Sequence, residues 1–130
     1  TQVICTLQLA INTLGKLFLD SSVLSMSKQI KEVCDLMILC RSMYQEEFDP
    51  SSKYYCNPFK TVLNKNTNQW ENVGWQPKDD MVYRAVFIEK SRSSGAVSSD
   101  TGIGYLFSFQ GQWGLWSDAA KARFKHGYIQ

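Results

Sequence analysis

The sequence predicts an α+β domain in which an N-terminal antiparallel helical hairpin packs on a four- to five-stranded antiparallel sheet, with a short C-terminal helix. Two observations lead to this fold class. Apolar residues recur every three or four positions before Asp49-Pro50, whereas they alternate or cluster in short aromatic runs after it. Of the 17 aromatic residues, 14 lie from Tyr54 onward, which is typical of strands. With 130 residues, the chain has the length of one domain, 1–130.

Residues 1–48 are expected to form the helical hairpin. Apolar positions three and four apart predict a first helix over about 3–18 and a second over about 22–47. Polar residues 20–22 separate the two helices and offer side-chain oxygens as a cap. Asp49-Pro50 should end the second helix, because the residue before a proline avoids the helical region. So short a turn makes the two helices antiparallel.

Residues 54–116 are expected to form an antiparallel meander. Alternating apolar residues and intervening turn residues mark its strands. The run Val86-Phe87-Ile88 is apolar at consecutive positions, so its strand should lie inside the sheet. Ser117 should cap a final helix over 117–126. The predicted strands are Tyr54–Leu63, Gln69–Trp75, Met81–Lys90, Ile103–Phe109 and Gln112–Trp116.

The charge of the chain is small and only mildly uneven. The net charge is +2; residues 1–50 carry 4 basic and 6 acidic side chains, and residues 51–130 carry 10 and 6. This balance implies no strong attraction to nucleic acid or to a membrane surface. The longest apolar stretch, 3–19, contains Thr6, Asn12 and Lys16, so we expect no membrane span and no evident signal peptide.

The four cysteines, Cys5, Cys34, Cys40 and Cys56, form no C-x-x-C pair, and the chain has a single histidine, His126. We therefore expect no metal site and no cofactor. A helical hairpin would bring Cys5 near Cys34, which leaves a disulfide as an alternative. The favoured interpretation is reduced thiols in an intracellular protein, cytoplasmic or nuclear.

No known catalytic motif is present, so the chain is not expected to be an enzyme and no catalytic residues are assigned. His126 could serve a cysteine nucleophile, but nothing in the sequence places a thiol beside it. It is interpreted as a cation near the end of the last helix.

The main functional hypothesis is a non-catalytic protein–protein interaction module, a subunit of a larger assembly or a homodimer. On the second helix, several apolar residues lie away from the main stripe, where they meet either the core or a partner. The tryptophans form two close pairs, and one member of each pair could remain exposed for binding. The partner-binding candidates are Leu36, Leu39, Met43, Trp75, Trp113 and Trp116.

The alternative hypothesis is a single-stranded nucleic-acid-binding domain that uses the aromatic residues of the sheet. Arg41 interrupts the apolar stripe; it either lays its stem over the core with a solvated guanidinium, pairs with a carboxylate, or binds an anion. The candidate anion or nucleic-acid contacts are Arg41, Lys90, Arg92, Lys121, Arg123 and Lys125.

Overall fold

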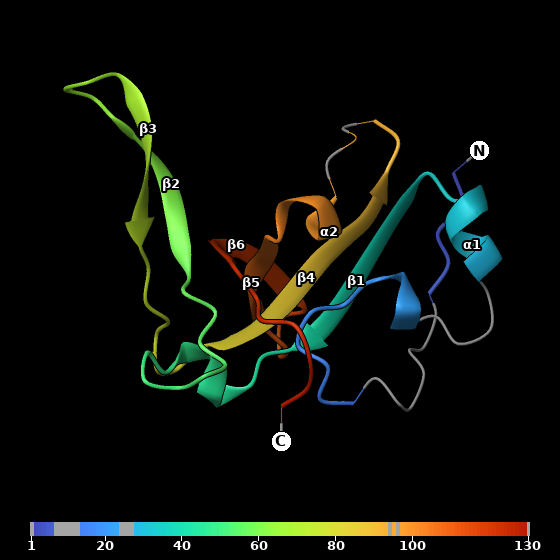
Figure 1. The fold of residues 1–130 in the computed structure, drawn as a ribbon, viewed down its shortest axis with the longest axis horizontal. Coiled ribbons are helices and arrows are strands. Elements are labelled where there is room, and N and C mark those ends of the chain that lie inside the picture. The colour runs from blue at the N-terminus through green and yellow to red at the C-terminus, as the bar shows by residue number, and fades with distance from the viewer. Residues whose placement is uncertain (1, 7–13, 24–27, 94, 96, 130) are drawn as a thin grey trace.

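The computed structural model describes residues 2–6, 14–23, 28–93, 95 and 97–129, and most of it is a six-stranded antiparallel sheet (Figure 1). The strand order is β1-β4-β5-β6-β2-β3. The strands are β1 (Leu36–Ser42), β2 (Phe59–Asn64), β3 (Gln69–Gly74), β4 (Val82–Ser91), β5 (Gly104–Gln110) and β6 (Leu115–Ala122). The helical elements are short: the 3-10 helices η2 (Ser21–Val23) and η3 (Gln45–Phe48) and the α-helices α1 (Lys28–Val33) and α2 (Ser98–Thr101).

The sheet has a compact part and a projecting part. Strand β4 pairs with β1 on one side and with β5 on the other, so the prediction that this strand is interior is confirmed. Strands β2 and β3 pair with each other along their whole length, but β2 meets β6 only at the pair Phe59–Lys121. The β2–β3 hairpin therefore projects from the rest of the sheet (Figure 1).

One face of the compact part carries the hydrophobic core. Residues of β1, β4, β5 and β6 on this face are buried, among them Leu39, Phe87 and Leu106. Irregular segments from both ends of the chain cross this face (Figure 1). They are joined by the hydrogen bonds Leu17 N–H to Gly127 O (2.9 Å) and Ile129 N–H to Gly15 O (2.8 Å).

An aromatic stack attaches these segments to the sheet. The ring of Phe18 lies 5.0 Å from that of Phe87 and 4.6 Å from that of His126, measured between centroids. Phe124 packs on the other side of Phe87, at 4.9 Å. His126 therefore lies in an irregular segment against Phe18, and its interpretation as a helix-end cation is wrong.

A buried ion pair holds β1, η3 and the N-terminal segment together. Arg41 donates two hydrogen bonds to Glu47 (2.6 and 2.9 Å) and two to the carbonyl of Leu17 (2.6 and 2.9 Å). The Arg41 side chain is only 9% exposed. Of the readings open for Arg41, pairing with a carboxylate is the one that the structure shows, and a solvated guanidinium is wrong.

The predicted helical hairpin over 1–48 is wrong, and with it the helix-on-sheet fold class. The described residues 2–6 and 14–18 are not helical. In the described part of 22–47, the predicted second helix, the only α-helix is the six-residue α1, beside parts of the 3-10 helices η2 and η3, and residues 36–42 form β1. Residues 7–13 and 24–27 lie outside the described part. In β1, Met37 and Leu39 are buried while Leu36 and Ile38 are exposed, which is the period of two of a strand. The same apolar residues also fit the spacing of a helix, but pairing with β4 stabilises the strand instead.

The predicted C-terminal helix over 117–126 is also wrong, because β6 continues to Ala122 and pairs with β5. Alanine favours helices, but Ala120 and Ala122 are buried in the core beneath the crossing segments. The strands predicted over Gln69–Trp75, Met81–Lys90 and Ile103–Phe109 are confirmed within one residue at each end.

Candidate functional site

The second face of the compact sheet, here called the open sheet face, lacks the covering segments of the first. Its residues alternate along each strand with those that enter the core, and the ladder pairs place them in rows across the strands. Most of them are apolar or aromatic. The open sheet face consists of Leu36, Ile38, Cys40, Ser42, Val82, Arg84, Val86, Ile88, Tyr105, Phe107, Phe109, Trp116, Asp118 and Lys121.

Large apolar side chains on this face are accessible to solvent. Val82 is 59% exposed, Ile38 53% and Trp116 43%. None of the apolar residues of the open sheet face belongs to the core cluster of the described residues or packs against it. A sheet face that exposes large apolar side chains in this way is typical of a contact surface.

An arginine and two aromatic rings lie together at one end of this face. The guanidinium carbon of Arg84 lies 4.4 Å from the ring centroid of Phe109 and 5.5 Å from that of Trp116. The two rings are 5.0 Å apart. Such contacts between a cation and the faces of aromatic rings are attractive. They fix the guanidinium over the apolar surface and reduce its freedom.

Arg84 lacks a carboxylate partner among the residues that the structure describes. Its Nε atom is buried and makes no hydrogen bond to them. The side chain beside it is the Cys40 thiol: burial raises the pKa of Cys40, and the cations of Arg84 and Arg41 oppose this shift only in part. A thiol that remains protonated at neutral pH does not neutralise a guanidinium, so Arg84 carries an uncompensated charge.

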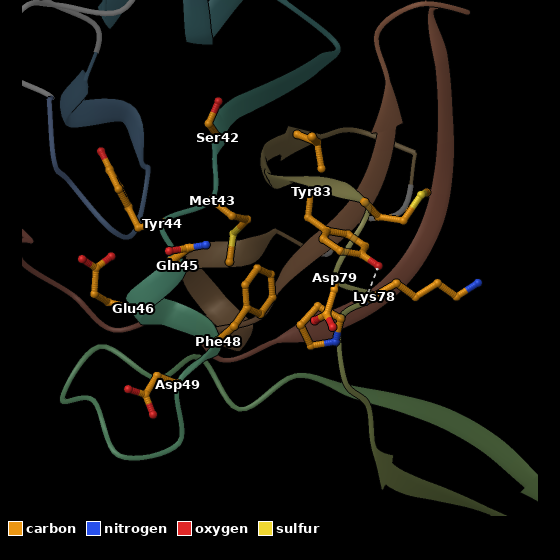
Figure 2. Close-up of a pocket in the computed structure, with 13 residues that line it drawn as sticks. Ser42, Met43, Tyr44, Gln45, Glu46, Phe48, Asp49, Lys78, Asp79 and Tyr83 are labelled. Atoms are coloured by element: carbon orange, nitrogen blue, oxygen red, sulfur yellow. Dashed lines mark hydrogen bonds between the residues drawn. The ribbon is translucent and has the colours of Figure 1, made fainter.

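A hollow of about 680 Å³ lies where β1 leads into η3 (Figure 2), and its lining includes Ser42 and Val82 of the open sheet face. Phe48 and Tyr83, which also line it, pack edge to face with ring centroids 5.7 Å apart. The carboxylates of Glu46 and Asp49 point away from these rings (Figure 2), and hydrogen bonds from Ser51 lower the pKa of Asp49. The residues lining the hollow include no histidine or cysteine. Its lining holds the carboxylates of Glu46, Asp49 and Asp79 and the ammonium group of Lys78.

The partner-binding candidates from the sequence are distributed over different parts of the molecule. Leu39 is a core residue, 5% exposed, so its proposed contact with a partner is wrong. Met43 and Trp75 pack against the core. Leu36, Trp113 and Trp116 are exposed; Leu36 and Trp116 lie on the open sheet face, whereas Trp113 lies in the turn before β6.

The candidate anion contacts are likewise separated. Arg92 pairs with Asp35 (2.8 Å), and the Lys90 ammonium group donates to the carbonyls of Lys31 and Glu32, so both bind the region between α1 and β1. Arg41 is buried with Glu47. The other three candidates, Lys121, Arg123 and Lys125, lie on and just beyond β6. The six cations therefore do not form one continuous basic surface.

The described residues give little support for a metal site or a reactive thiol. No group of three or more histidine, cysteine or acidic side chains there lies close enough together to hold a metal ion. Cys5, Cys34, Cys40 and Cys56 are free thiols. Burial and the nearby Glu47 carboxylate raise the pKa of Cys56 to about 12, which makes it a poor nucleophile. Within the described ranges, no helix is long and apolar enough to cross a membrane.

Sequence reasoning missed most of the open sheet face. The interior position of β4 was recognised from Val86-Phe87-Ile88, which implies that both faces of that strand are apolar. The pattern could not show that only one face is covered, because the covering segments come from the two ends of the chain. Residues 36–42 were assigned to a helix, so Ile38 was not aligned with Val82 and Phe109.

The comparisons with known proteins do not supply a function. No protein-family model matches the chain, and no curated protein or solved structure is significantly similar to it.

Proposed function

We propose that this protein is a non-catalytic interaction module that assembles through its open sheet face, with a second copy of the chain as the partner. One observation carries the proposal: Ile38, Val82 and Trp116 are about half exposed on a single sheet face whose apolar residues contribute nothing to the core. Removing such a surface from water is favourable by roughly 25 cal/mol for each Å² buried.

A second copy is favoured by the composition of the face. Homodimer interfaces are more apolar than those of transient complexes. The charged residues of this face are Arg84, Asp118 and Lys121, so two copies can meet without a large excess of like charge. An interface of about 800 Å² on each copy would be of ordinary size for a stable complex.

Solution mass tests this proposal. Light scattering over a wide range of concentrations is expected to give twice the chain mass for the wild type. Val82→Lys should give a monomer, because the new ammonium group would have to be buried on docking. The matched control is Val62→Lys, which changes a valine on the projecting hairpin and should leave the dimer intact. A wild type that stays monomeric at every concentration would contradict the proposal.

A second candidate function, single-stranded nucleic-acid binding, is favoured by the aromatic rings of Tyr105, Phe107 and Phe109 on an open sheet. It is the weaker candidate, because Arg84 already lies against Phe109 and because Lys90 and Arg92 are bound elsewhere. A fluorescent oligonucleotide titrated at low salt distinguishes the two functions. Binding that weakens steeply with salt would favour the nucleic acid.

A further inference from the structure

The open sheet face carries two unpaired charges of opposite sign in one row. The ladder pairs Arg84 with Phe107 and Phe107 with Asp118, so the three side chains lie side by side on the same face. Neighbouring strands are about 4.8 Å apart, which places Arg84 and Asp118 at nearly equal distances on either side of Phe107.

Neither charge has an opposite charge bound to it. Arg84 forms no ion pair with a described residue, and its Nε atom is buried without a hydrogen bond. Asp118 is exposed and also forms no ion pair in the described part of the chain. It borders a hollow of about 280 Å³ between β6 and β2, which leaves its carboxylate open to approach. Covering Arg84 with an apolar partner would bury its charge at a high cost unless the partner supplied a carboxylate.

From this arrangement we infer that Arg84 is a carboxylate-binding site and that its ligand is Asp118 of a second copy of the chain. The inference rests on the proposed function, because it requires the open sheet faces of two copies to meet. In the resulting dimer each Arg84 binds the other copy's Asp118, which gives two identical ion pairs related by a two-fold axis.

The row geometry selects the direction of that axis. An axis in the plane between the two sheets, parallel to β5 and above Phe107, places Arg84 opposite Asp118 of the second copy and the two Phe107 rings opposite each other. Packed sheets are about 10 Å apart. Arg84 and an aspartate can span this distance together once the guanidinium leaves the Phe109 and Trp116 rings and extends toward the second copy. An in-plane axis perpendicular to the strands would instead bring the two Arg84 side chains together and create repulsion.

Of the two neighbouring rows, Val86–Tyr105–Lys121 would place Lys121 opposite Val86 of the second copy. The other row is fully compatible with the same axis. The ladder aligns Val82 with Phe109 and Phe109 with Trp116. The axis along β5 therefore places Val82 opposite Trp116 of the second copy and the two Phe109 rings opposite each other. An aliphatic side chain then meets an indole, and no further charge is buried in that row.

Charge reversal tests the inference. Arg84→Glu would place Glu opposite Asp118 in a dimer of that variant, and Asp118→Arg would place Arg opposite Arg84. Each variant alone should therefore dissociate, with the dissociation constant raised at least about tenfold. In an equimolar mixture of the two variants, both contacts become attractive, so the mixed dimer should recover the wild-type solution mass.

The outcomes separate the two proposals. If the variants alone associate like the wild type, or if the mixture stays monomeric while the wild type is dimeric, the ion pair is wrong. The proposed function then still stands on the effect of Val82→Lys. If the wild type is monomeric, or if Val82→Lys associates normally, both proposals are overturned. If circular dichroism shows that Arg84→Glu does not fold, the test relies on Asp118→Arg, whose site is exposed. An unchanged dissociation constant for Asp118→Arg overturns the inference.

Discussion

At the scale of single residues, the Arg41–Glu47 pair shows how a charge can be part of the core. Glu47 accepts hydrogen bonds from the guanidinium and from the backbone N–H of Tyr44 (3.0 Å), so its carboxylate is fully used. Arg41 lies on the core face of β1, in the ladder position opposite the buried Ala85. The sequence could suggest a carboxylate partner for Arg41, but it could not identify Glu47, because that contact depends on the chain turning at η3.

Removing one partner of this pair should destabilise the fold strongly. In Glu47→Gln the guanidinium keeps its charge but loses the opposite charge beside it, and such changes cost about 3–5 kcal/mol of unfolding free energy. Urea denaturation measures the loss. The matched control is Asp35→Asn, which breaks the exposed pair with Arg92 and should cost less than about 1 kcal/mol. Equal losses in the two variants would show that the buried pair does not hold these segments together.

At the scale of elements, the sequence of residues 22–47 does not distinguish a helix from a strand. A run such as Leu36-Met37-Ile38-Leu39 places apolar residues on every side, so it fits both periods. The strands after Gln69 were easier to predict, because turn residues bound them and aromatic residues alternate within them. The helix predicted at the end of the chain rested on Ser117 as a capping residue, a local signal that the pairing of β6 with β5 outweighs.

The close packing of β5 beneath Phe124 gives a prediction at this scale. A Cβ atom added at Gly104 would lie 2.5 Å and 2.7 Å from ring atoms of Phe124 and 3.0 Å from the ring of Phe87. Gly104→Ala should therefore lower the unfolding free energy by about 1–3 kcal/mol, as measured by thermal or urea denaturation.

Gly74 supplies the matched control for this prediction. It also lies in a strand, but nothing stands within 4 Å of the position of an added Cβ. Gly74→Ala should change the stability by no more than about 0.5 kcal/mol. If Gly104→Ala were as well tolerated as Gly74→Ala, the C-terminal segment would not lie on β5 as described.

At the scale of the whole molecule, the sheet is covered on one face and open on the other. If two long helices had packed on the sheet, as the sequence predicted, they would have determined which face of the sheet stayed exposed. Instead, short segments from both ends cover one face, and the other remains as a mostly apolar and aromatic surface of fourteen residues. The sequence predicted a set of exposed apolar side chains, and two of its candidates, Leu36 and Trp116, lie on this face. It missed Arg84, Phe107 and Asp118, whose alignment exists only once β4, β5 and β6 have paired.

The most direct test of the central claim, that copies of the chain meet through the open sheet face, is ¹⁹F NMR of fluorotryptophan-labelled protein during dilution. The resonance of Trp116, which lies on that face, should shift as the dimer dissociates. That of Trp70, which is exposed on the projecting hairpin, should stay constant. A Trp116 resonance that remains unchanged across a measured change in solution mass would show that the copies associate elsewhere.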